Sequence, residues 1–337
     1  MDINTIWYAL IAVLFIGYFF LEGFDFGVGI LLPVIARNDI ERRIVINTIG
    51  PFWDANEVWL ITAGGAMFAA FPDWYATLFS GFYLPLFLIL VALILRAVGF
   101  EFRGKLDNVG WRRAADTAIV IGSALPAFLW GVAITNLVRG VPIGPDMQFQ
   151  GSLLTLLNPF SLLGGLVSIF VFSLHGALFL NLRAEEGLAE RARSLALRLW
   201  WPAAIVMLGF FLASYSQTDL FSRSGLVPGT VPVLAMIMFV ASFVLARLRF
   251  GGWAFATTGL TIVLATVVAF HGLYPRVMPS SLGSGYDLTV YNASSSAMTL
   301  HVMLVVAIIF VPIVLAYQGY SYWVFRRRVT RRSLGGS

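Results

Sequence analysis

Four carboxylic acids fall within two strongly apolar stretches of this sequence, where a charge is costly. The two pairs are Glu22 with Asp25 and Asp54 with Glu57. The members of each pair are three residues apart, so both acids of a pair share one face of a helix. Burial and crowding of like charges favour the neutral form of a carboxyl group, which suits a group that exchanges protons near neutral pH. Two tryptophans, Trp53 and Trp59, flank the second pair and are expected to wall the space around it.

The composition shows why these acids are unusual. The chain has 337 residues, of which 59% are hydrophobic and only 12% are charged, and its mean hydropathy is +0.86. A soluble domain carries about 25% charged residues, and it does not repeat apolar runs of about 20 residues, the length that crosses roughly 30 Å of hydrocarbon. The sequence therefore predicts an all-α polytopic membrane protein.

The first residues, the cysteine content and the charge narrow the class further. Residues 1–5 lack the basic region and the cleavage site of a removable signal peptide, so the first apolar run is expected to remain as a helix. Without cysteine, the chain has no disulfide, thiolate metal site, cysteine-ligated iron–sulfur cluster or covalently attached haem. The net charge of +5 is expected to reflect basic loops on the cytoplasmic face of a membrane rather than nucleic-acid binding.

Apolar runs predict nine membrane-spanning helices. They cover residues 7–35, 48–71, 74–102, 113–139, 158–182, 196–215, 229–249, 252–272 and 298–325. With the N-terminus outside and the C-terminus inside, 18 of the 22 basic residues fall in segments on the cytoplasmic side, as the positive-inside rule requires. The outer connections at 140–157 and 273–297 are long, and the second is rich in helix breakers, which indicates an ordered cap or a docking surface.

A short internal repeat suggests how the helices are grouped. Leu21-Glu-Gly23, near the inner end of the first predicted helix, is matched by Leu174-His-Gly176 near the inner end of the fifth. We therefore expect a single transmembrane domain with two parallel four-helix halves, 1–140 and 150–272, followed by a ninth helix at 298–325.

The predicted topology places the buried acids in a band nearer the cytoplasm. The first helix runs inward and the second outward, so both acidic pairs lie in the inner half of the membrane. The third helix brings Arg96 to the same depth, about one and a half turns before its exit at Glu101. We hypothesise a proton-conducting polar inlet that opens to the cytoplasm. Two alternatives stay open: helices bridged by hydrogen bonds with Arg96 neutralising one acid, and a site for a cation.

Three histidines are formal candidates for a haem ligand, because haem iron takes histidine or methionine. His175 lies near the inner end of its predicted helix, whereas His271 and His301 flank the second outer loop. No two of them form an obvious ligand pair, so structural roles are expected, and His175 is kept as the candidate for cofactor binding. The sequence predicts no metal site and no soluble-type catalytic motif.

Five stretches of the sequence form a recognisable set of motifs. They are Glu22-Gly-Phe-Asp-Phe-Gly-Val-Gly29, Gly50-Pro-Phe-Trp-Asp-Ala-Asn-Glu-Val-Trp-Leu60, Arg96-Ala-Val-Gly-Phe-Glu-Phe-Arg103, Leu174-His-Gly-Ala177 and Asn292-Ala-Ser-Ser-Ser296. Together they resemble subunit II of cytochrome bd-type quinol oxidase, and the resemblance extends from residue 1 to Arg326. Phe52 and Ala55 depart from the family pattern, in which valine or glycine is usual, as small packing changes beside the second acidic pair.

The resemblance implies a nine-helix subunit paired pseudosymmetrically with a homologous subunit I in a prokaryotic cell membrane. The complex would oxidise quinol on the outer side and reduce dioxygen to water, taking protons from the cytoplasm without pumping them. Two b haems, haem d and the main quinol loop would belong to subunit I, so this chain would have no catalytic site of its own. Single-helix accessory subunits, a structural quinone in this chain and the choice between ubiquinol and menaquinol stay open.

In such a complex, the acids of the first two helices would feed protons toward the haems of subunit I. The proton-pathway residues that the resemblance implies are Asp25 and Asp54, with Trp53, Glu57 and Arg96 in support, and with Glu22 and Glu101 as further members. An ion- or proton-coupled transporter would use the same buried acids and is the alternative function. Copurification with a haem-bearing partner would distinguish the two.

Overall fold

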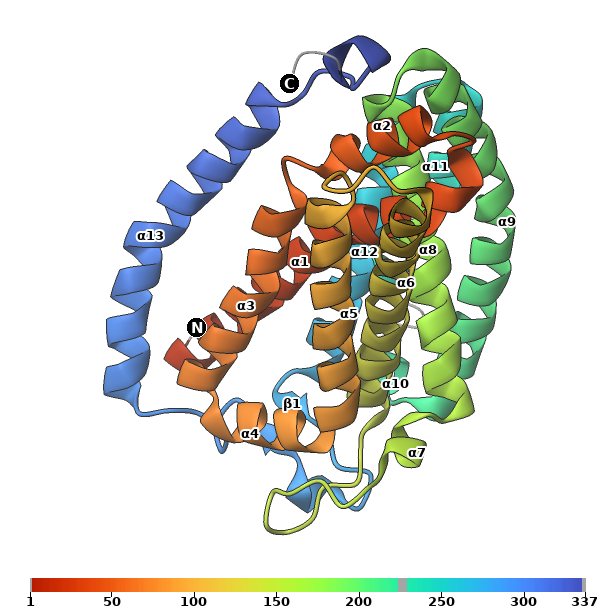
Figure 1. Ribbon diagram of the computed structural model, residues 1–337. Coiled ribbons are helices and arrows are strands. Elements are labelled where there is room, and N and C mark those ends of the chain that lie inside the picture. The colour runs from red at the N-terminus through yellow and green to blue at the C-terminus, as the bar shows by residue number, and fades with distance from the viewer. Residues whose placement is uncertain (1, 224–228, 335–337) are drawn as a thin grey trace.

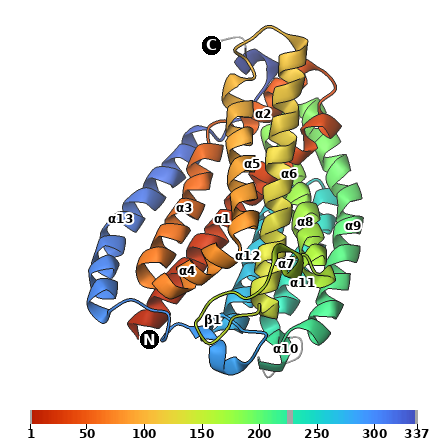
Figure 2. The same cartoon turned by 60° about the horizontal axis from the view of Figure 1, so that its bottom comes forward.

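Long helices packed side by side form most of the molecule, and the computed structural model describes residues 2–223 and 229–334. The α-helices are α1 Ile3–Ile35, α2 Asp39–Ile49, α3 Trp53–Ala70, α4 Pro72–Gly81, α5 Tyr83–Phe102, α6 Val109–Arg139, α7 Leu153–Leu156, α8 Pro159–Arg183, α9 Glu186–Gln217, α10 Leu220–Arg223, α11 Thr230–Arg247, α12 Gly251–Leu273 and α13 Ala297–Val324. The remaining elements are the strands β1 Arg276–Met278 and β2 Leu288–Thr289 and the 3-10 helices η1 Ser284–Tyr286 and η2 Arg331–Leu334. Figures 1 and 2 show α2 and the C-terminal segment at one end of the bundle, with α4, α7 and β1 at the other.

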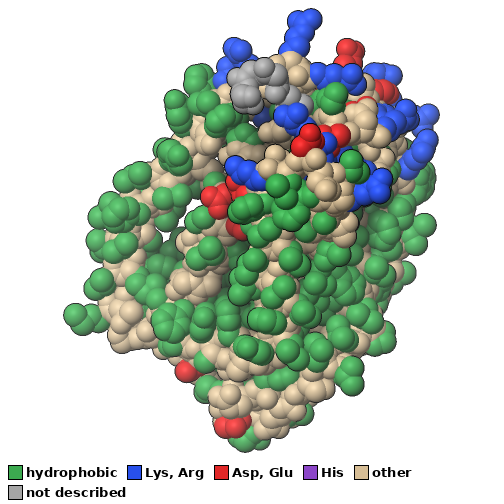
Figure 3. All heavy atoms as spheres, viewed as in Figure 1, with side chains coloured by type: hydrophobic (Ala, Val, Ile, Leu, Met, Phe, Trp, Pro, Cys, Tyr) green, Lys and Arg blue, Asp and Glu red, His purple; other side chains and the backbone are tan. Residues whose placement is uncertain are grey.

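Eight of the described helices are long and apolar enough to cross a membrane, namely α1, α5, α6, α8, α9, α11, α12 and α13. The ninth long helix, α3, has 18 residues and carries Asp54 and Glu57. These nine helices correspond to the nine predicted crossings, so the prediction of an all-α multi-pass membrane protein is confirmed. Lys and Arg side chains gather at the end that carries α2 and the C-terminal segment (Figure 3), which is the end assigned to the cytoplasm from the charge distribution.

Most of residues 36–47, which separate the first two predicted helices, form an additional helix, α2, that was not predicted. Asn38 caps this helix by accepting a hydrogen bond from the amide of Glu41, and Asp39 lies in the first turn. The Nη2 atom of Arg103 is 2.7 Å from Asp39 Oδ1. Partial burial by itself raises the pKa of Asp39, but the hydrogen bond and the charge of Arg103 hold that pKa below its usual value. Ion pairing therefore fixes α2 against the inner end of α5.

Two local breaks also correct the predicted helix boundaries. The second crossing begins at Trp53 rather than at residue 48, because Pro51 has no amide hydrogen with which to continue α2. The run predicted as one helix over 74–102 is interrupted at Phe82. In Figure 1, α4 lies across the outer end of the bundle and α5 alone runs through it. α6 and α9 begin earlier than predicted, because their charged first turns extend the helices beyond the apolar runs.

The two long outer connections are ordered and joined to each other. β1 and β2 pair as a short antiparallel sheet within the second connection. Val141 of the first connection forms an isolated parallel bridge with Ser280 of the second, and its amide donates to the carbonyl oxygen of Pro279 at 3.1 Å. At this end of the bundle the structure therefore has a cap of hydrogen-bonded backbone.

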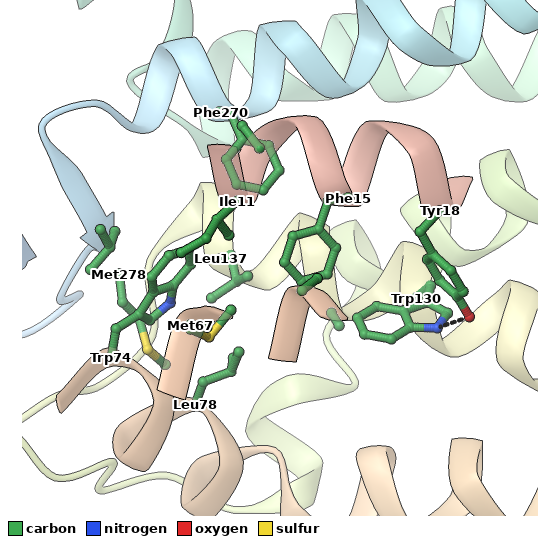
Figure 4. Close-up of a cluster of buried hydrophobic side chains, with 14 of the residues drawn as sticks. Ile11, Phe15, Tyr18, Met67, Trp74, Leu78, Trp130, Leu137, Phe270 and Met278 are labelled. Atoms are coloured by element: carbon green, nitrogen blue, oxygen red, sulfur yellow. Dashed lines mark hydrogen bonds between the residues drawn. The ribbon is translucent and has the colours of Figure 1, made fainter. Parts of the chain in front are cut away.

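Aromatic and large aliphatic side chains fill the outer half of the bundle between α1, α3, α4, α6 and α12 (Figure 4). Trp130 Nε1 donates to the hydroxyl of Tyr18 at 3.1 Å, and the ring of Phe15 packs edge-on against Trp130. The hydroxyl of Tyr8 donates to the carbonyl oxygen of Phe270 at 2.6 Å. Tyr8, Tyr18 and Trp130 thus satisfy their polar atoms within the cluster, and none of the described buried acids lies in this apolar half of the bundle. A polar route into the bundle therefore has to start from the inner end.

The backbones of α1 and α8 touch where Gly27 faces Gly176. A Cβ atom on Gly27 would lie 2.9 Å from the Cα of Gly176, and one on Gly176 would lie 2.5 Å from the carbonyl carbon of Gly27. Real Cβ atoms do not approach backbone atoms so closely, so only glycine fits at either position. This contact sets the depth and rotation of the α1 segment that carries Glu22 and Asp25.

The division of the chain into two four-helix halves stays a prediction.

Helix α13 stands apart from the bundle along most of its length. Only Leu300 and Gln318 are buried among its described residues, whereas its central side chains, such as Ile309 and Phe310, are 54% and 58% exposed. Its outer end is held where Trp7 Nε1 donates to the carbonyl oxygen of Leu300 at 2.9 Å. A gap separates its central part from α3 in Figure 1, and the space-filling view shows the molecule hollowed there (Figure 3). Met303, Leu304 and Ala307 pack partly against the core, but most of the central part of this helix has no packing partner among the described residues.

We predict that the substitution Gly176→Ala destabilises the protein by about 1–3 kcal/mol, because the added methyl group forces α1 and α8 apart. The measurement is the thermal unfolding midpoint of the purified protein. Gly209→Ala in α9 is the matched control, since no atom lies within 4 Å of a Cβ built there. An unchanged midpoint for Gly176→Ala would contradict the backbone contact.

Candidate functional site

A single arginine joins two of the predicted acids in the interior of the bundle. Arg96 of α5 places its Nη2 atom 2.7 Å from Glu22 Oε2 of α1 and 2.5 Å from Glu57 Oε1 of α3. The side chains of Arg96 and Glu22 are fully buried, and that of Glu57 is 19% exposed. Breaking such a buried pair costs several kcal/mol, because the remaining charge has no compensation. The three helices are therefore held at one relative depth by this shared contact.

The position of Arg96 depends on close packing against α1 and α6. Its guanidinium carbon lies 4.7 Å from the ring centre of Phe26, a cation–π contact. On the α6 side, a Cβ atom on Gly122 would lie 2.6 Å from the Cβ of Arg96. Glycine at this position lets α6 approach α5 closely enough to cover the arginine.

Asp25 is fully buried beside this pair, but it does not contact the arginine within hydrogen-bond distance. Its Oδ2 atom accepts a hydrogen bond of 2.7 Å from Asn56 Nδ2 of α3. The amide oxygen of Asn56 in turn accepts from the hydroxyl of Tyr322 at 2.8 Å and from Gln318 Nε2 at 3.3 Å. Asn56, Gln318 and Tyr322 were not predicted as site residues. The signal for Asn56 was available, since it is a buried amide between the two acids of one motif, whereas nothing local marks the two residues of α13.

Several polar atoms of the cluster have no hydrogen-bond partner within the described chain. They are Glu22 Oε1, Asp25 Oδ1, Arg96 Nε and Nη1, and Ser123 Oγ. Buried polar atoms are nearly always satisfied, and small internal water molecules are the usual partners where protein atoms are absent. The side of the cluster that these atoms line is therefore chemically suited to hold water.

The other predicted site residues lie at or near the surface around this cluster. Asp54 and Glu101 are exposed, although Asp54 is only three residues from Glu57. Trp53 is buried and packs against Phe100 with ring centres 5.4 Å apart. The ring centre of Phe100 also lies 6.0 Å from the Arg96 guanidinium carbon, so the Phe100 ring links Trp53 to the cluster.

A second ion-pair network lies at the inner surface and was not predicted. Arg103 Nε is 2.6 Å from Asp116 Oδ1, and Arg42 Nη1 is 2.6 Å from the other oxygen of that carboxylate. Arg191 of α9 pairs with Glu41 of α2 at 2.7 Å. These contacts join α2, α5, α6 and α9 at the rim of the bundle, where the side chains are partly hydrated.

His175 was the candidate for cofactor binding, and its surroundings do not fit a haem. Its ring lies face to face with Phe255 at 4.4 Å, with Phe20 also in contact at 5.6 Å. Its Nδ1 atom is 2.8 Å from the hydroxyl of Thr258, and a Cβ on Gly259 would already touch the ring at 3.4 Å. The Nε2 atom has no hydrogen-bond partner among the described residues, yet the aromatic packing leaves no space for a porphyrin plane beside it.

An apolar cavity of about 210 Å³ lies in the outer half of the bundle, among α1, α6, α8, α9 and α12. Its walls include Trp130, Phe172, Met207 and Phe210, and none of the predicted acids reaches it. Within the described residues, no group of three or more His, Asp or Glu side chains is placed to hold a metal ion. The cavity suits an apolar molecule or tail rather than an ion.

Comparisons with known proteins show the family to which the chain belongs. The family model for cytochrome bd terminal oxidase subunit II matches residues 3–325. A curated relative, cytochrome bd ubiquinol oxidase subunit 2 of Bacillus subtilis (strain 168), is 46% identical over 331 residues, which cover 98% of both chains. Cytochrome bd-I ubiquinol oxidase subunit 2 of Escherichia coli (strain K12) is 37% identical over 368 residues, covering 98% of this chain and 96% of that one.

The fold is also similar to a solved structure, that of the bd oxidase from Geobacillus thermodenitrificans. The TM-score is 0.78 over 96% of this chain and 99% of the matched chain, at 19% sequence identity, so this likeness concerns the fold alone. The relatives are bacterial, and the long apolar helices make this chain a multi-pass protein of the cell membrane. Because the family model spans nearly all of the sequence and the curated relatives match over nearly their full lengths, the chain belongs to the cytochrome bd terminal oxidase subunit II family.

Proposed function

We propose that this chain carries protons from the cytoplasmic side toward haems that subunit I of the oxidase holds. The complex would oxidise quinol and reduce dioxygen to water, with the protons taken from the cytoplasm and not pumped. The observation that supports this role is the buried cluster of Glu22, Asp25, Glu57 and Arg96, which lies inward of an apolar outer half. Family membership favours the oxidase over the transporter that the same acids would also suit.

The charge balance of the cluster favours proton exchange over simple ion pairing. The cluster holds three carboxyl groups but one guanidinium, which contacts Glu22 and Glu57, while the hydrogen-bond partner of Asp25 is the neutral amide of Asn56. If all these groups were charged, the cluster would carry a surplus negative charge in a medium where charge is costly. Protons are the simplest compensation, because burial favours the neutral form of a carboxyl group. A purely bridging cluster would instead need about one cation for each acid.

We propose that protons enter from the inner surface and reach the buried acids through Glu57. Asp54 and Glu101 are exposed on that surface, and Glu57 lies between it and Arg96 with 19% of its side chain exposed. Trp53 would shield the passage from lipid. Glu22 and Asp25 would then hand protons on toward the partner subunit, with internal water bridging the unpaired oxygens.

The outward faces of α3, α5 and α13 are the surface that we propose for subunit I. Exposed apolar residues on them include Val58, Ile61, Phe68, Leu90, Ile94, Ile309 and Phe310. Asp54 lies on the same face of α3 as Val58 and Ile61, because these positions are about one turn apart. An acid at the inner end of the docking surface would be well placed to collect protons for Glu57. The chain would thus serve as a scaffold as well as a proton path.

The haems and the site of quinol oxidation belong to subunit I in this proposal, because His175 does not offer room for a haem. When bound there, the haem irons supply electron transfer and oxygen reduction, and the roles of this chain concern protons and assembly. A structural quinone in this subunit stays a prediction, and the apolar cavity near Trp130 and Phe172 is the place we propose for its tail. Single-helix accessory subunits also stay a prediction.

We expect Asp25→Asn to slow proton uptake during a single turnover of oxygen reduction by roughly a hundredfold, the lower end of what a lost proton-transfer group costs. Uptake would be followed with a pH-indicator dye in the purified complex, after its haem spectrum shows normal assembly. Asp146→Asn, an exposed acid of the outer connection, is the matched control and should react like the unmodified protein. Unimpaired uptake in Asp25→Asn would rule out this path.

Replacing the shared cation tests the pairing itself. Arg96→Leu should lower stability by about 3–5 kcal/mol, because Glu22 and Glu57 lose their buried partner. Adding Glu22→Gln to Arg96→Leu removes one uncompensated charge and should restore part of the thermal unfolding midpoint. Arg43→Leu, an exposed arginine of α2, is the control and should leave the midpoint unchanged. If the double variant were no more stable than Arg96→Leu alone, the ion pair would not be what holds these helices.

A further inference from the structure

The hydrogen bonds between α3 and α13 form a chain that ends at Asp25. The indole Nε1 of Trp59 donates to Gln318 Oε1 at 2.9 Å, and Gln318 Nε2 donates to Asn56 Oδ1 at 3.3 Å. The Nδ2 atom of Asn56 then donates to Asp25 Oδ2 at 2.7 Å. Four side chains from three helices are linked in sequence, and Asn56, Gln318 and Asp25 are all buried.

The Trp59 indole determines which groups donate and which accept along this chain of hydrogen bonds. An indole N–H can only donate a hydrogen bond, so Gln318 has to turn its oxygen toward Trp59 and its amino group toward Asn56. Asn56 in turn has to present its oxygen to Gln318 and its amino group to Asp25. The two amides, whose oxygen and nitrogen are otherwise interchangeable, thus each have one favoured orientation. Asp25 Oδ2 consequently always receives an N–H donor.

The inner end of α13 holds the middle of this chain in place. Tyr322 donates its hydroxyl to Asn56 Oδ1 at 2.8 Å, and its ring stacks on Phe52 with ring centres 4.3 Å apart and parallel planes. At the end of α8, the guanidinium carbon of Arg183 lies 5.5 Å from the centre of the Phe52 ring. Phe52, where a small packing change was expected, packs against the inner end of α13 through the rings of Tyr322 and Phe325.

We propose that Trp59, Gln318 and Asn56 are positioning residues that hold the Asp25 carboxyl in one orientation, with Oδ2 occupied and Oδ1 left to take the proton. The inference rests on the proposed proton path. Oδ1 is the atom that lacks a protein partner, whereas Oδ2 is engaged by an amide that cannot turn away. A carboxyl group constrained in this way accepts and releases its proton on one side only, at the oxygen that the Asn56 amide does not occupy.

The test uses the intact complex and measures proton uptake in a single turnover together with the infrared band of the Asp25 carboxyl, identified as the band that Asp25→Asn removes. Asn56→Leu takes away the donor, and it should slow uptake by roughly three- to tenfold and shift the band, as expected for one lost hydrogen bond. Trp59→Phe leaves Asn56 intact but frees Gln318 to turn, and it should give a smaller change of about two- to threefold with a broadened band.

Two substitutions at exposed positions serve as controls. Trp253→Phe changes an indole that is exposed on α12, and Tyr320→Phe removes an exposed hydroxyl of α13, two residues from Gln318. Both should leave the rate and the band unchanged. Variants are compared only at equal haem content, and an unchanged KM for quinol separates a proton-transfer effect from a distorted complex.

The outcomes separate this inference from the function on which it rests. Slower uptake in Asp25→Asn with normal uptake and an unshifted band in both Asn56→Leu and Trp59→Phe would overturn the positioning chain and leave the proton path standing. Normal uptake in Asp25→Asn would overturn the proton path itself, and the positioning role with it. A shifted band and slower uptake in Asn56→Leu and Trp59→Phe would support the inference, provided that both controls leave the rate and the band unchanged.

Discussion

The contact of one guanidinium with two carboxyl groups is the constraint on which the inner half of this protein depends. Insertion of a charged residue at the centre of a membrane helix costs about 2.5–3.5 kcal/mol, so Arg96 is tolerable only where both Glu22 and Glu57 reach it. That requirement fixes the rotation of α1, α3 and α5 together. Gly27 and Gly122 also help to fix these helices. Gly27 lets α8 approach α1, and Gly122 lets α6 approach α5, so that the charged groups are covered.

Much of this arrangement could be predicted from the sequence, because membrane helices follow simple rules of length and charge. The apolar runs predicted long helices that correspond to eight candidate membrane spans and α3, and the basic residues predict their direction. The acids of α1 and the arginine of α5 stood out because charge is rare in such segments. Glu22, Glu57 and Arg96 are brought together in the structure, as the common depth of the three helices led us to expect.

What could not be predicted is which way each helix turns its side chains. Spacing places Asp54 and Glu57 on neighbouring parts of one helix surface, but only the packing of α3 against α1 turns Glu57 inward and leaves Asp54 exposed. Asn56 was overlooked for the same reason. Its partners Gln318 and Tyr322 come from a helix more than 260 positions away, which no local pattern connects to α3. The break at Phe82 was hidden because apolar residues continue on both sides of it.

The isolation of α13 has a consequence for how the complex is put together. In water, a helix with so much exposed apolar surface would be driven to associate by the hydrophobic effect, but lipid tails are as apolar as the side chains of this helix. The surface of α13 in an unassembled subunit therefore has little tendency to associate nonspecifically. The subunit can remain dispersed in the bilayer until it meets its partner. Recognition then has to come from shape and from the few polar groups at the ends of the helix. The groups that select the right partner are therefore different from the apolar side chains that keep the helix stable in the membrane.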